Sequence, residues 1–244
     1  MPLIALMGNP NTGKTAIFNL LTGMNQKVSN YPGITVEQRR GNAQLKENCA
    51  VQIMDMPGTY SLTPESLDEK IVAQQTLKWL NGIDRPVAII SVVDAGNLSR
   101  NLYLTSQVME LGIPVIIALN MMDMVMQKNQ NIDGIKLQKM LGVQAVVPMS
   151  AREKWGIEEL QTELLNVIKL ENSEISSHLQ IKIPKEIEKI INPISEFLND
   201  ENNHDNYITN IQALRIITRK SALELYSECE NLNDTEIKSL TLLR

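Results

Sequence analysis

Short and almost continuous apolar runs recur along the first 170 residues, and amphipathic stretches separate them. A strand that is buried on both faces shows such a run, because neither face needs polar residues. The stretches between the runs carry apolar residues three or four positions apart, which is the spacing of one helical face. We predict strands over residues 3–7, 36–45, 50–54, 86–93, 114–119 and 144–148. We predict helices over residues 14–22, 64–80, 98–111, 135–141 and 157–170.

The connections between these elements indicate how the sheet is built. The link over residues 46–48 is short, which favours an antiparallel hairpin between the two strands that it joins. Elsewhere a helix lies between successive strands, and such crossovers produce parallel strands with helices on both faces. Residues 23–35 are rich in turn-forming residues and are predicted to form an exposed loop. The fold class is therefore α/β, with a mostly parallel sheet and one antiparallel hairpin strand.

Past residue 170 the strand pattern does not return. Residues 171–180 read as a polar linker, and a helical spacing follows at Ile187, Ile190, Ile191, Ile194 and Leu198. Pro193 lies inside this run and is expected to kink the helix or split it. A polar break at 199–206 precedes helices predicted over 207–226 and 234–244. We therefore divide the chain into a domain of residues 1–170 and a small all-α domain of residues 171–244.

Composition narrows the classes of protein to consider. With 244 residues, 43% hydrophobic and 21% charged, the chain has the composition of a globular protein. Its net charge of −5 disfavours a nucleic-acid-binding surface, because phosphate backbones select basic patches. The two cysteines lack metal-ligand spacing, so they predict neither a disulfide framework nor a zinc site. No apolar run reaches the roughly 18 residues of a membrane span, so we expect a soluble chain.

A phosphate-binding loop follows the first predicted strand. Residues 8–15 read Gly-Asn-Pro-Asn-Thr-Gly-Lys-Thr, which matches the pattern G-x-x-x-x-G-K-[ST] between a strand and a helix. Its glycines let backbone N–H groups point at phosphate oxygens, and the helix start adds its positive dipole end. Lys14 is expected to reach the β- and γ-phosphates, and the Thr15 hydroxyl to bind Mg²⁺. The loop predicts a nucleoside triphosphate site.

A second motif predicts which base is bound. Asn120 and Asp123 follow the predicted strand 114–119 in the spacing N-x-x-D. A carboxylate at Asp123 can accept two hydrogen bonds from the N1–H and 2-amino groups of guanine, whereas adenine would leave it unpaired. Such a buried unpaired group costs about 1–3 kcal/mol, and more when it is charged. We expect Asn120 to brace the loop and Ser150-Ala151 to offer a backbone N–H to guanine O6, which together predict GTP.

A third motif predicts a response to the γ-phosphate. Residues 55–58 read D-x-x-G, so Asp55 is expected to hold Mg²⁺ through a water and the Gly58 N–H to bond the γ-phosphate. Thr35, in the loop 23–35, supplies the second hydroxyl for Mg²⁺ once that loop closes. Hydrolysis removes the phosphate that holds both segments, so their order reports the nucleotide state.

Longer stretches around these motifs closely resemble the FeoB family of bacterial ferrous iron transporters. The resemblance is carried by residues 8–15, 30–37 (Asn-Tyr-Pro-Gly-Ile-Thr-Val-Glu), 55–62 (Asp-Met-Pro-Gly-Thr-Tyr-Ser-Leu), 93–102 and 118–123. It covers about residues 1–165 and implies a Ras-like G domain. The resemblance also implies that residues 171–244 correspond to the family's helical domain, described as favouring GDP retention. Family members continue into a membrane permease domain, which this chain ends before, so we interpret it as the cytosolic N-terminal portion.

The resemblance also implies partners, a place in the cell and a second cation. The implied partners are GTP and GDP, the permease domain and a small cytosolic FeoA-type protein, at the cytoplasmic face of the bacterial inner membrane. An asparagine at the position of Asn11 helps to coordinate K⁺ in potassium-activated G proteins of this type; an ordinary turn-stabilising asparagine is the alternative. Thr59 stands where Ras-like proteins place a water-orienting glutamine, which leaves that role unassigned and implies slow hydrolysis that depends on backbone groups.

The predicted site combines these assignments. The predicted GTP-binding residues are Gly8, Asn9, Pro10, Asn11, Thr12, Gly13, Lys14, Thr15, Ala16, Gly33, Ile34, Thr35, Asp55, Gly58, Asn120, Asp123, Met124, Ser150, Ala151 and Arg152. The predicted catalytic residues are Lys14, Thr35, Gly58 and Thr59. The predicted metal ligands are Thr15, Thr35 and Asp55 for Mg²⁺ and Asn11 for K⁺.

Two other functions remain open at this point. A stand-alone GTPase acting on RNA or ribosomes would carry a basic module, whereas this chain is acidic. A nucleotide switch that barely hydrolyses GTP would differ from a GTP-hydrolysing regulatory domain only in its rate of turnover. His178 and His204 stand apart in polar surroundings, so we interpret them as surface residues rather than iron ligands. The methionines Met121, Met122, Met124 and Met126 are expected to pack or to line a loop.

Overall fold

The computed structural model describes residues 1–23, 26–30, 37–64, 66–170, 183–202, 206–218, 220–229 and 234–243. By its internal contacts the chain divides into two compact units. The first consists of Met1–Ser61 and Pro86–Leu179, and the second of Leu62–Arg85 and Gln180–Arg244.

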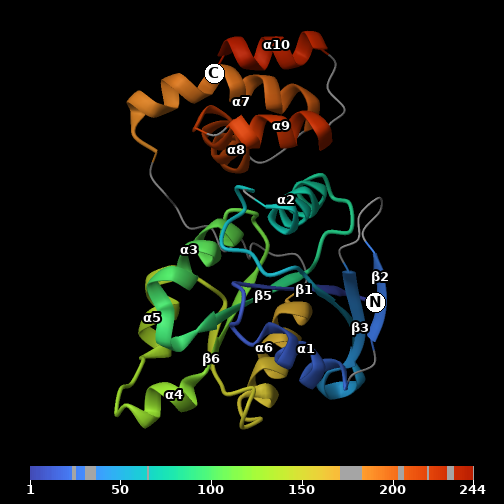
Figure 1. The fold of residues 1–244 in the computed structure, drawn as a ribbon, viewed down its shortest axis with the longest axis vertical. Helices are drawn as coiled ribbons and strands as arrows, with labels where there is room; N and C mark the ends of the chain where they lie inside the picture. Colours follow the sequence, from blue (N-terminus) through green and yellow to red (C-terminus); the bar gives the residue numbers. More distant parts are fainter. Residues whose placement is uncertain are drawn as a thin grey trace. The chain divides into compact units, whose positions relative to one another are not determined.

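A twisted sheet forms the centre of the first unit (Figure 1). Within the described residues its strands are β1 (Leu3–Gly8), β2 (Gln26–Asn30), β3 (Glu37–Gln44), β4 (Ala50–Asp55), β5 (Ala88–Asp94), β6 (Val115–Asn120) and β7 (Ala145–Pro148). They lie in the order β2-β3-β4-β1-β5-β6-β7. Strand β3 pairs antiparallel with β2 and β4, and the other pairs are parallel. The mostly parallel α/β sheet with one reversed strand is thus confirmed.

Helices cover both faces of this sheet. They are α1 (Lys14–Thr22), α3 (Leu98–Met109), α4 (Met122–Gln127), α5 (Gly134–Leu141) and α6 (Ile157–Lys169), with short 3₁₀ turns at Lys46–Asn48 and Ala95–Asn97. Helices α1 and α6 pack on one face, where Phe18 and Leu160 are fully buried against Ile4 and Ile90. Burying one such side chain contributes about 1.5–3 kcal/mol, so this layer stabilises the packing of α1 and α6 on β1 and β5. The short helix α4 was not predicted.

The predicted loop over residues 23–35 is wrong in one part. Residues Gln26–Asn30 form the edge strand β2, with Lys27 opposite Arg40 and Ser29 opposite Gln38 in the register of β3. Their sequence contains a single apolar residue, Val28, so no alternation indicated a strand. The strand forms because its backbone groups pair with β3, and an edge strand requires no apolar face.

Helices make up the second unit, as far as its residues are described. They are α2 (Leu67–Leu80), α7 (Lys185–Asn202), α8 (Asn206–Thr218), α9 (Lys220–Cys229) and α10 (Asp234–Leu243). Their apolar side chains form one cluster, in which Ile191, Ile216 and Leu223 are buried and Leu77 of α2 packs alongside. An ion pair of 2.7 Å between Lys70 and Glu228 joins α2 to α9.

Three predictions for the helical region need correction. Helix α7 continues through Pro193 to Asn202, so the proline does not split it and the predicted polar break begins later than residue 199. The single helix predicted over 207–226 is instead two helices, α8 and α9. Helix α2 begins at Leu67 rather than at residue 64, because Ser66 caps it by accepting a hydrogen bond from the Glu69 N–H at 3.3 Å. Among the described residues, no helix has both the length and the apolar character that crossing a membrane requires.

Candidate functional site

The loop between β1 and α1 is shaped by two glycines. A Cβ on Gly8 would lie 2.8 Å from the Val92 carbonyl oxygen of β5, so a larger residue would push the strands apart. Gly13 has a φ of 88°, and a Cβ there would lie 2.3 Å from Nδ2 of Asn120. Only glycine satisfies both the conformation and the close approach at position 13. The two glycines therefore leave the loop backbone open to an anion.

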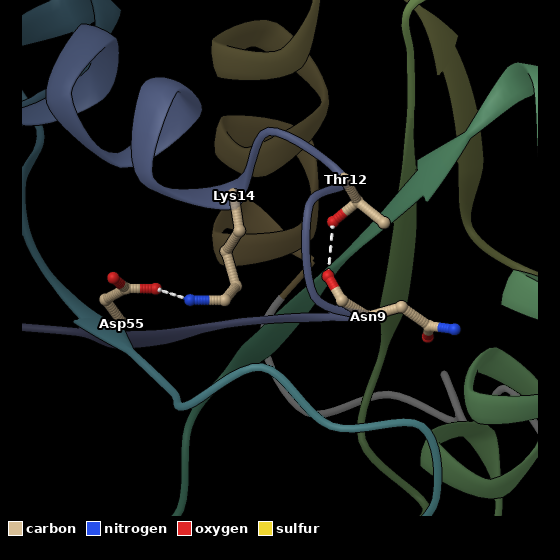
Figure 2. Close-up of polar contacts among 4 residues, drawn as sticks. All are labelled: Asn9, Thr12, Lys14 and Asp55. Atoms are coloured by element: carbon tan, nitrogen blue, oxygen red, sulfur yellow. Dashed lines mark hydrogen bonds and ion pairs between the residues drawn. The ribbon is translucent and has the colours of Figure 1, made fainter. Parts of the chain in front are cut away.

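Three other residues of this loop differ in their hydrogen bonds and in their exposure. The Thr12 hydroxyl donates to the Asn9 carbonyl at 2.9 Å, which closes the turn from inside. Asn11 has a φ of 64° and is exposed. The Asn9 side chain is 3% exposed, and within the described part of the chain neither of its carboxamide atoms has a hydrogen-bond partner. Figure 2 shows this carboxamide pointing away from Lys14 and Asp55, so it does not face the cradle that these residues line.

Lys14 and Asp55 form an ion pair at the centre of the site (Figure 2). Nζ of Lys14 donates to Oδ1 of Asp55, and both side chains are largely buried. They meet because Leu6 of β1 is the parallel partner of Asp55 at the end of β4. A phosphate would compete for Lys14, and a divalent cation would compete for Asp55. Binding of a magnesium–nucleotide complex would therefore replace the Lys14–Asp55 ion pair with two new interactions, one between Lys14 and phosphate and one between Asp55 and Mg²⁺.

The residues near this pair fit a magnesium ion held together with phosphates. Thr15, in the first turn of α1, is exposed and offers a hydroxyl, and Asp55 offers a carboxylate. Such hard oxygen donors suit Mg²⁺, which usually keeps several waters and takes only one or two carboxylates. In the described residues, no group of three or more His, Cys, Asp or Glu side chains could hold a metal by itself. This donor set therefore fits Mg²⁺ only as part of a nucleotide complex.

Asn120 connects the phosphate loop to the loop after β7. Its Nδ2 donates to the Thr12 carbonyl at 2.9 Å, and its Oδ1 accepts the Ala151 N–H at 2.9 Å. The side chain is 3% exposed. The bracing role predicted for Asn120 is thus visible in its contacts. The Ala151 N–H, predicted to face guanine O6, donates to Asn120 in this structure.

Asp123 follows Asn120 by three residues, in a turn whose backbone is held by a hydrogen bond. It is 7% exposed and sits in the first turn of α4, after Met121 with a φ of 63°. The Met122 N–H donates to the Met149 carbonyl at 3.2 Å, which ties this turn to the segment after β7. The terminal methyl of Met121 lies near Gly13, on the phosphate-loop side. Met121 was not among the predicted site residues, although its position inside the N-x-x-D motif was a signal that could have indicated it.

The loop after β7 is tightly constrained. Ser150 and Trp155 exchange two backbone hydrogen bonds of 3.2 Å, and the Ser150 hydroxyl accepts the Glu153 N–H at 3.1 Å. Gly156 has a φ of 84°, and a Cβ there would lie 2.4 Å from Cβ of Met149. Ser150 and Ala151 are buried, whereas Met124 and Arg152 are exposed.

The segment after β4 lies along the phosphate loop. Its Met56 N–H donates to the Leu6 carbonyl at 3.0 Å, and its Thr59 N–H donates to the Gly8 carbonyl at 3.3 Å. A Cβ on Gly58 would lie 3.2 Å from Cα of Pro10. Thr59 is 1% exposed, and its hydroxyl donates to the Ser61 carbonyl at 2.7 Å. The hydroxyl is therefore engaged within the segment rather than presented to a reacting water.

The strands bring together the predicted residues that the structure describes, because each motif follows the carboxyl end of a parallel strand. These residues come from the ends of β1, β4 and β6, from the loops that follow β1, β4 and β7, and from the first turns of α1 and α4. Gly33, Ile34 and Thr35 lie outside the described residues, as do His178 and His204.

Similarity to known proteins shows the family to which the chain belongs. The family model described as ferrous iron transport protein B matches residues 3–164. The chain belongs to this family. A Legionella pneumophila (strain Paris) Fe(2+) transporter FeoB is 46% identical over 165 residues, which cover 66% of this chain and 21% of the relative. A Staphylococcus aureus (strain MSSA476) Fe(2+) transporter FeoB is 37% identical over 228 residues, covering 93% of this chain and 32% of that relative. The chain thus spans between a fifth and a third of the length of these curated relatives.

Solved structures share the fold over the whole chain. The cytosolic domain of L. pneumophila FeoB is 34% identical, with a TM-score of 0.78, and the match covers 99% of this chain and 97% of that one. The cytosolic domain of T. maritima FeoB in its GMPPNP form is 31% identical, with a TM-score of 0.79, covering 100% of this chain and 92% of that one. The FeoB likeness inferred from the motifs is confirmed.

Proposed function

We propose that this chain binds and hydrolyses GTP and regulates a bacterial ferrous iron transporter. The main observation behind the proposal is the pair of buried hydrogen bonds made by Asn120. They join the phosphate loop to the loop that contains Ala151. A phosphate loop alone fits many nucleotides, whereas this bridge joins the phosphate loop to Asn120, three residues before Asp123, and to the loop that carries Ala151. The relatives support the proposal, since solved FeoB cytosolic domains include GDP and GMPPNP forms.

Guanine recognition rests on Asp123. Asp123 is 7% exposed, so a base without N–H donors at its N1 and C2 positions, such as adenine, would leave a buried charge unpaired. Discrimination against adenine therefore arises from a penalty on the wrong base as well as from pairing with the right one. The Ala151 N–H would reach guanine O6 only by sharing or exchanging its bond to Asn120.

Phosphate binding is proposed to break the Lys14–Asp55 pair. Lys14 would turn to the β- and γ-phosphates, while Asp55, through a water, and the Thr15 hydroxyl would hold Mg²⁺ with those phosphates. The ion supplies charge neutralisation at the phosphates when it is bound. Thr35 stays a predicted ligand of the same ion. Loss of the γ-phosphate would release the Gly58 N–H, so the segment after β4 would report the nucleotide state.

Hydrolysis is proposed to be slow and to depend on backbone groups near Gly58 and Thr59. The Thr59 hydroxyl donates to Ser61, so the side chain that replaces the Ras-like glutamine is already occupied. Asn11 is proposed to help coordinate K⁺ beside the phosphates; its exposed side chain leaves it accessible for this role. Its φ of 64° equally suits an asparagine that only stabilises the turn. Faster hydrolysis in K⁺ than in Na⁺, abolished in Asn11→Ala, would support the cation site.

The cellular role follows the family. We propose that the chain acts at the cytoplasmic face of the bacterial inner membrane, coupled to a permease domain, with residues 171–244 as a GDP-retaining helical domain. A relative from Porphyromonas gingivalis is a fusion of Fe(2+) transport protein A and FeoB, and it matches this chain at 39% identity. This fusion supports a FeoA-type partner.

Multiple-turnover phosphate release tests the enzymatic part of the proposal. With saturating GTP, Mg²⁺ and K⁺, we expect many phosphates per chain, and no comparable release with ATP. A single turnover or less would favour a nucleotide switch that barely hydrolyses GTP. Stimulation by RNA or ribosomes would instead favour the RNA-linked GTPase.

A further inference from the structure

Tyr60 connects the segment after β4 to helix α3. The guanidinium carbon of Arg100 lies 4.2 Å from the centroid of the Tyr60 ring, which is the geometry of a cation–π contact. Tyr60 is 39% exposed, and Arg100 is exposed in the first turn of α3. Both residues belong to stretches that resemble the FeoB family, and the proposed function assigns neither of them a role.

Helix α3 is a firm anchor for this contact. The Asn101 Oδ1 accepts the Asp94 N–H at 3.3 Å, and its Nδ2 donates to the Asn97 carbonyl at 2.9 Å. Deeper in the core, the hydroxyls of Ser91 and Thr105 share a buried hydrogen bond of 2.8 Å between β5 and α3. These bonds fix the start of α3, and with it Arg100, on the sheet.

The opposite end of the segment touches the phosphate loop. Tyr60 directly follows Thr59, whose N–H donates to the Gly8 carbonyl at 3.3 Å, and Gly58 packs against Pro10. Residues 58–60 thus form a strap, which runs from the phosphate loop to α3. Its loop end carries the backbone groups proposed to meet the γ-phosphate, and its other end is held by Arg100.

We propose that Arg100 is a positioning residue for GTP hydrolysis, acting through Tyr60 on the backbone of Gly58 and Thr59. This inference rests on the proposed function. The contact restricts the strap to positions beside the phosphate loop, and catalysis through backbone groups depends strongly on their placement. A cation–π contact at an exposed site shifts an equilibrium by about two- to fivefold, so the expected effect on rate has that size.

A double-mutant cycle on the 244-residue chain tests the proposal. Single-turnover hydrolysis of bound GTP and the Kd of GTP are measured for Arg100→Ala, Tyr60→Leu and the double variant. We expect each single variant to lower the hydrolysis rate by about two- to fivefold, with Kd changed less than about twofold. The double variant is expected to be no slower than either single one, since both remove the same contact.

Graded replacements separate this contact from a general loss of packing. Tyr60→Phe and Tyr60→Trp keep an aromatic face, so each should lose less of the hydrolysis rate than Tyr60→Leu does, and Arg100→Lys should lose less of it than Arg100→Ala does. Tyr103→Leu is the matched control, because Tyr103 lies on the exposed face of α3 and its hydroxyl contacts Gln107 of the same helix. It should leave the rate unchanged.

Several outcomes would overturn the inference. Additive effects in the cycle, an unchanged rate in the single variants, or a faster rate on loss of the contact would each contradict it. A loss of a hundredfold or more in Arg100→Ala with no effect of Tyr60→Leu would mean that Arg100 touches the phosphates itself. If the wild-type chain released no phosphate from GTP, the proposed function would fail, whereas normal wild-type hydrolysis with unaffected variants rejects this inference alone.

Discussion

The two sides of the site differ in how far they are assembled before a nucleotide binds. On the base side, Asn120 holds the phosphate loop and the Ala151 loop together with two buried bonds of 2.9 Å each. On the phosphate side, Lys14 and Asp55 neutralise one another, and the exposed Asn11 and Thr15 are available to a ligand. The base side is therefore largely preorganised, with only the bond from the Ala151 N–H to Asn120 left to be shared with a base, whereas on the phosphate side both Lys14 and Asp55 must exchange partners.

This difference suits a switch. A rigid base pocket provides affinity and selectivity that do not depend on the γ-phosphate, so both GTP and GDP can be retained. In the proposed function, a phosphate side that changes partners would couple the presence of the γ-phosphate to the position of the segment after β4. Variants on the two sides should therefore affect different properties of the chain.

The largest effect is expected from Asn120→Ala. The substitution removes two buried hydrogen bonds and leaves the Ala151 N–H unpaired, so the free energy of unfolding should fall by about 2–4 kcal/mol. Urea unfolding of the nucleotide-free chain measures the change. Asn166→Ala, at an exposed position of α6, is the matched control and should change stability by less than about 0.5 kcal/mol. An equally stable Asn120→Ala chain would contradict a preorganised base side.

A smaller effect is expected from Asp55→Asn on the phosphate side. A hydrogen bond to a charged group contributes about 1.5–3 kcal/mol, so the nucleotide-free chain should lose up to that amount of stability. Nucleotide affinity should also lose its dependence on Mg²⁺, while the preference for guanine over adenine stays the same. Titrations of GDP and ADP with Mg²⁺ or EDTA measure both properties. A changed base preference would contradict the claim that the base side and the phosphate side determine different properties.

Asp123→Asn should alter base selectivity without changing the dependence on Mg²⁺. A carboxamide can pair with the carbonyl that xanthine carries in place of the guanine 2-amino group, so preference should shift from guanosine toward xanthosine nucleotides. The lost interaction is about 1–3 kcal/mol, or roughly ten- to hundredfold in Kd. Competition between GDP and XDP measures the shift. Unchanged selectivity would refute the base contact assigned to Asp123.

Thr59→Ala should produce the smallest effect. Since the Thr59 hydroxyl is engaged with Ser61, its removal should lower kcat by less than about tenfold, through a looser strap. Phosphate release under saturating GTP measures kcat. A loss of about a hundredfold or more would identify Thr59 as the missing water-positioning group.

Most of the sheet was predictable from the sequence because its central strands are buried on both faces. The apolar runs placed β1, β4, β5, β6 and β7 within one or two residues of their observed bounds. Strand β2 was missed because pairing at a sheet edge leaves no apolar pattern. The amphipathic pattern of α2 showed that one face is buried, but not that Leu77 packs with the cluster around Ile191.

For the site, the motif spacings predicted which loops converge, since each motif follows a strand of one parallel sheet. The motif spacings did not predict which side chains contact one another. The contacts between Lys14 and Asp55 and between Tyr60 and Arg100 join residues some forty positions apart, and they depend on strand register and rotamers rather than on local pattern. The bond from Ala151 to Asn120 was missed for the same reason.

Competition between GDP and ADP for the wild-type chain tests the central claim most directly. If Asn120 and Asp123 form a preorganised guanine pocket, GDP should bind at least about a hundredfold more tightly than ADP, because adenine leaves a buried carboxylate unpaired. Equal affinities for GDP and ADP would contradict the account, since the phosphate loop alone does not distinguish the two bases.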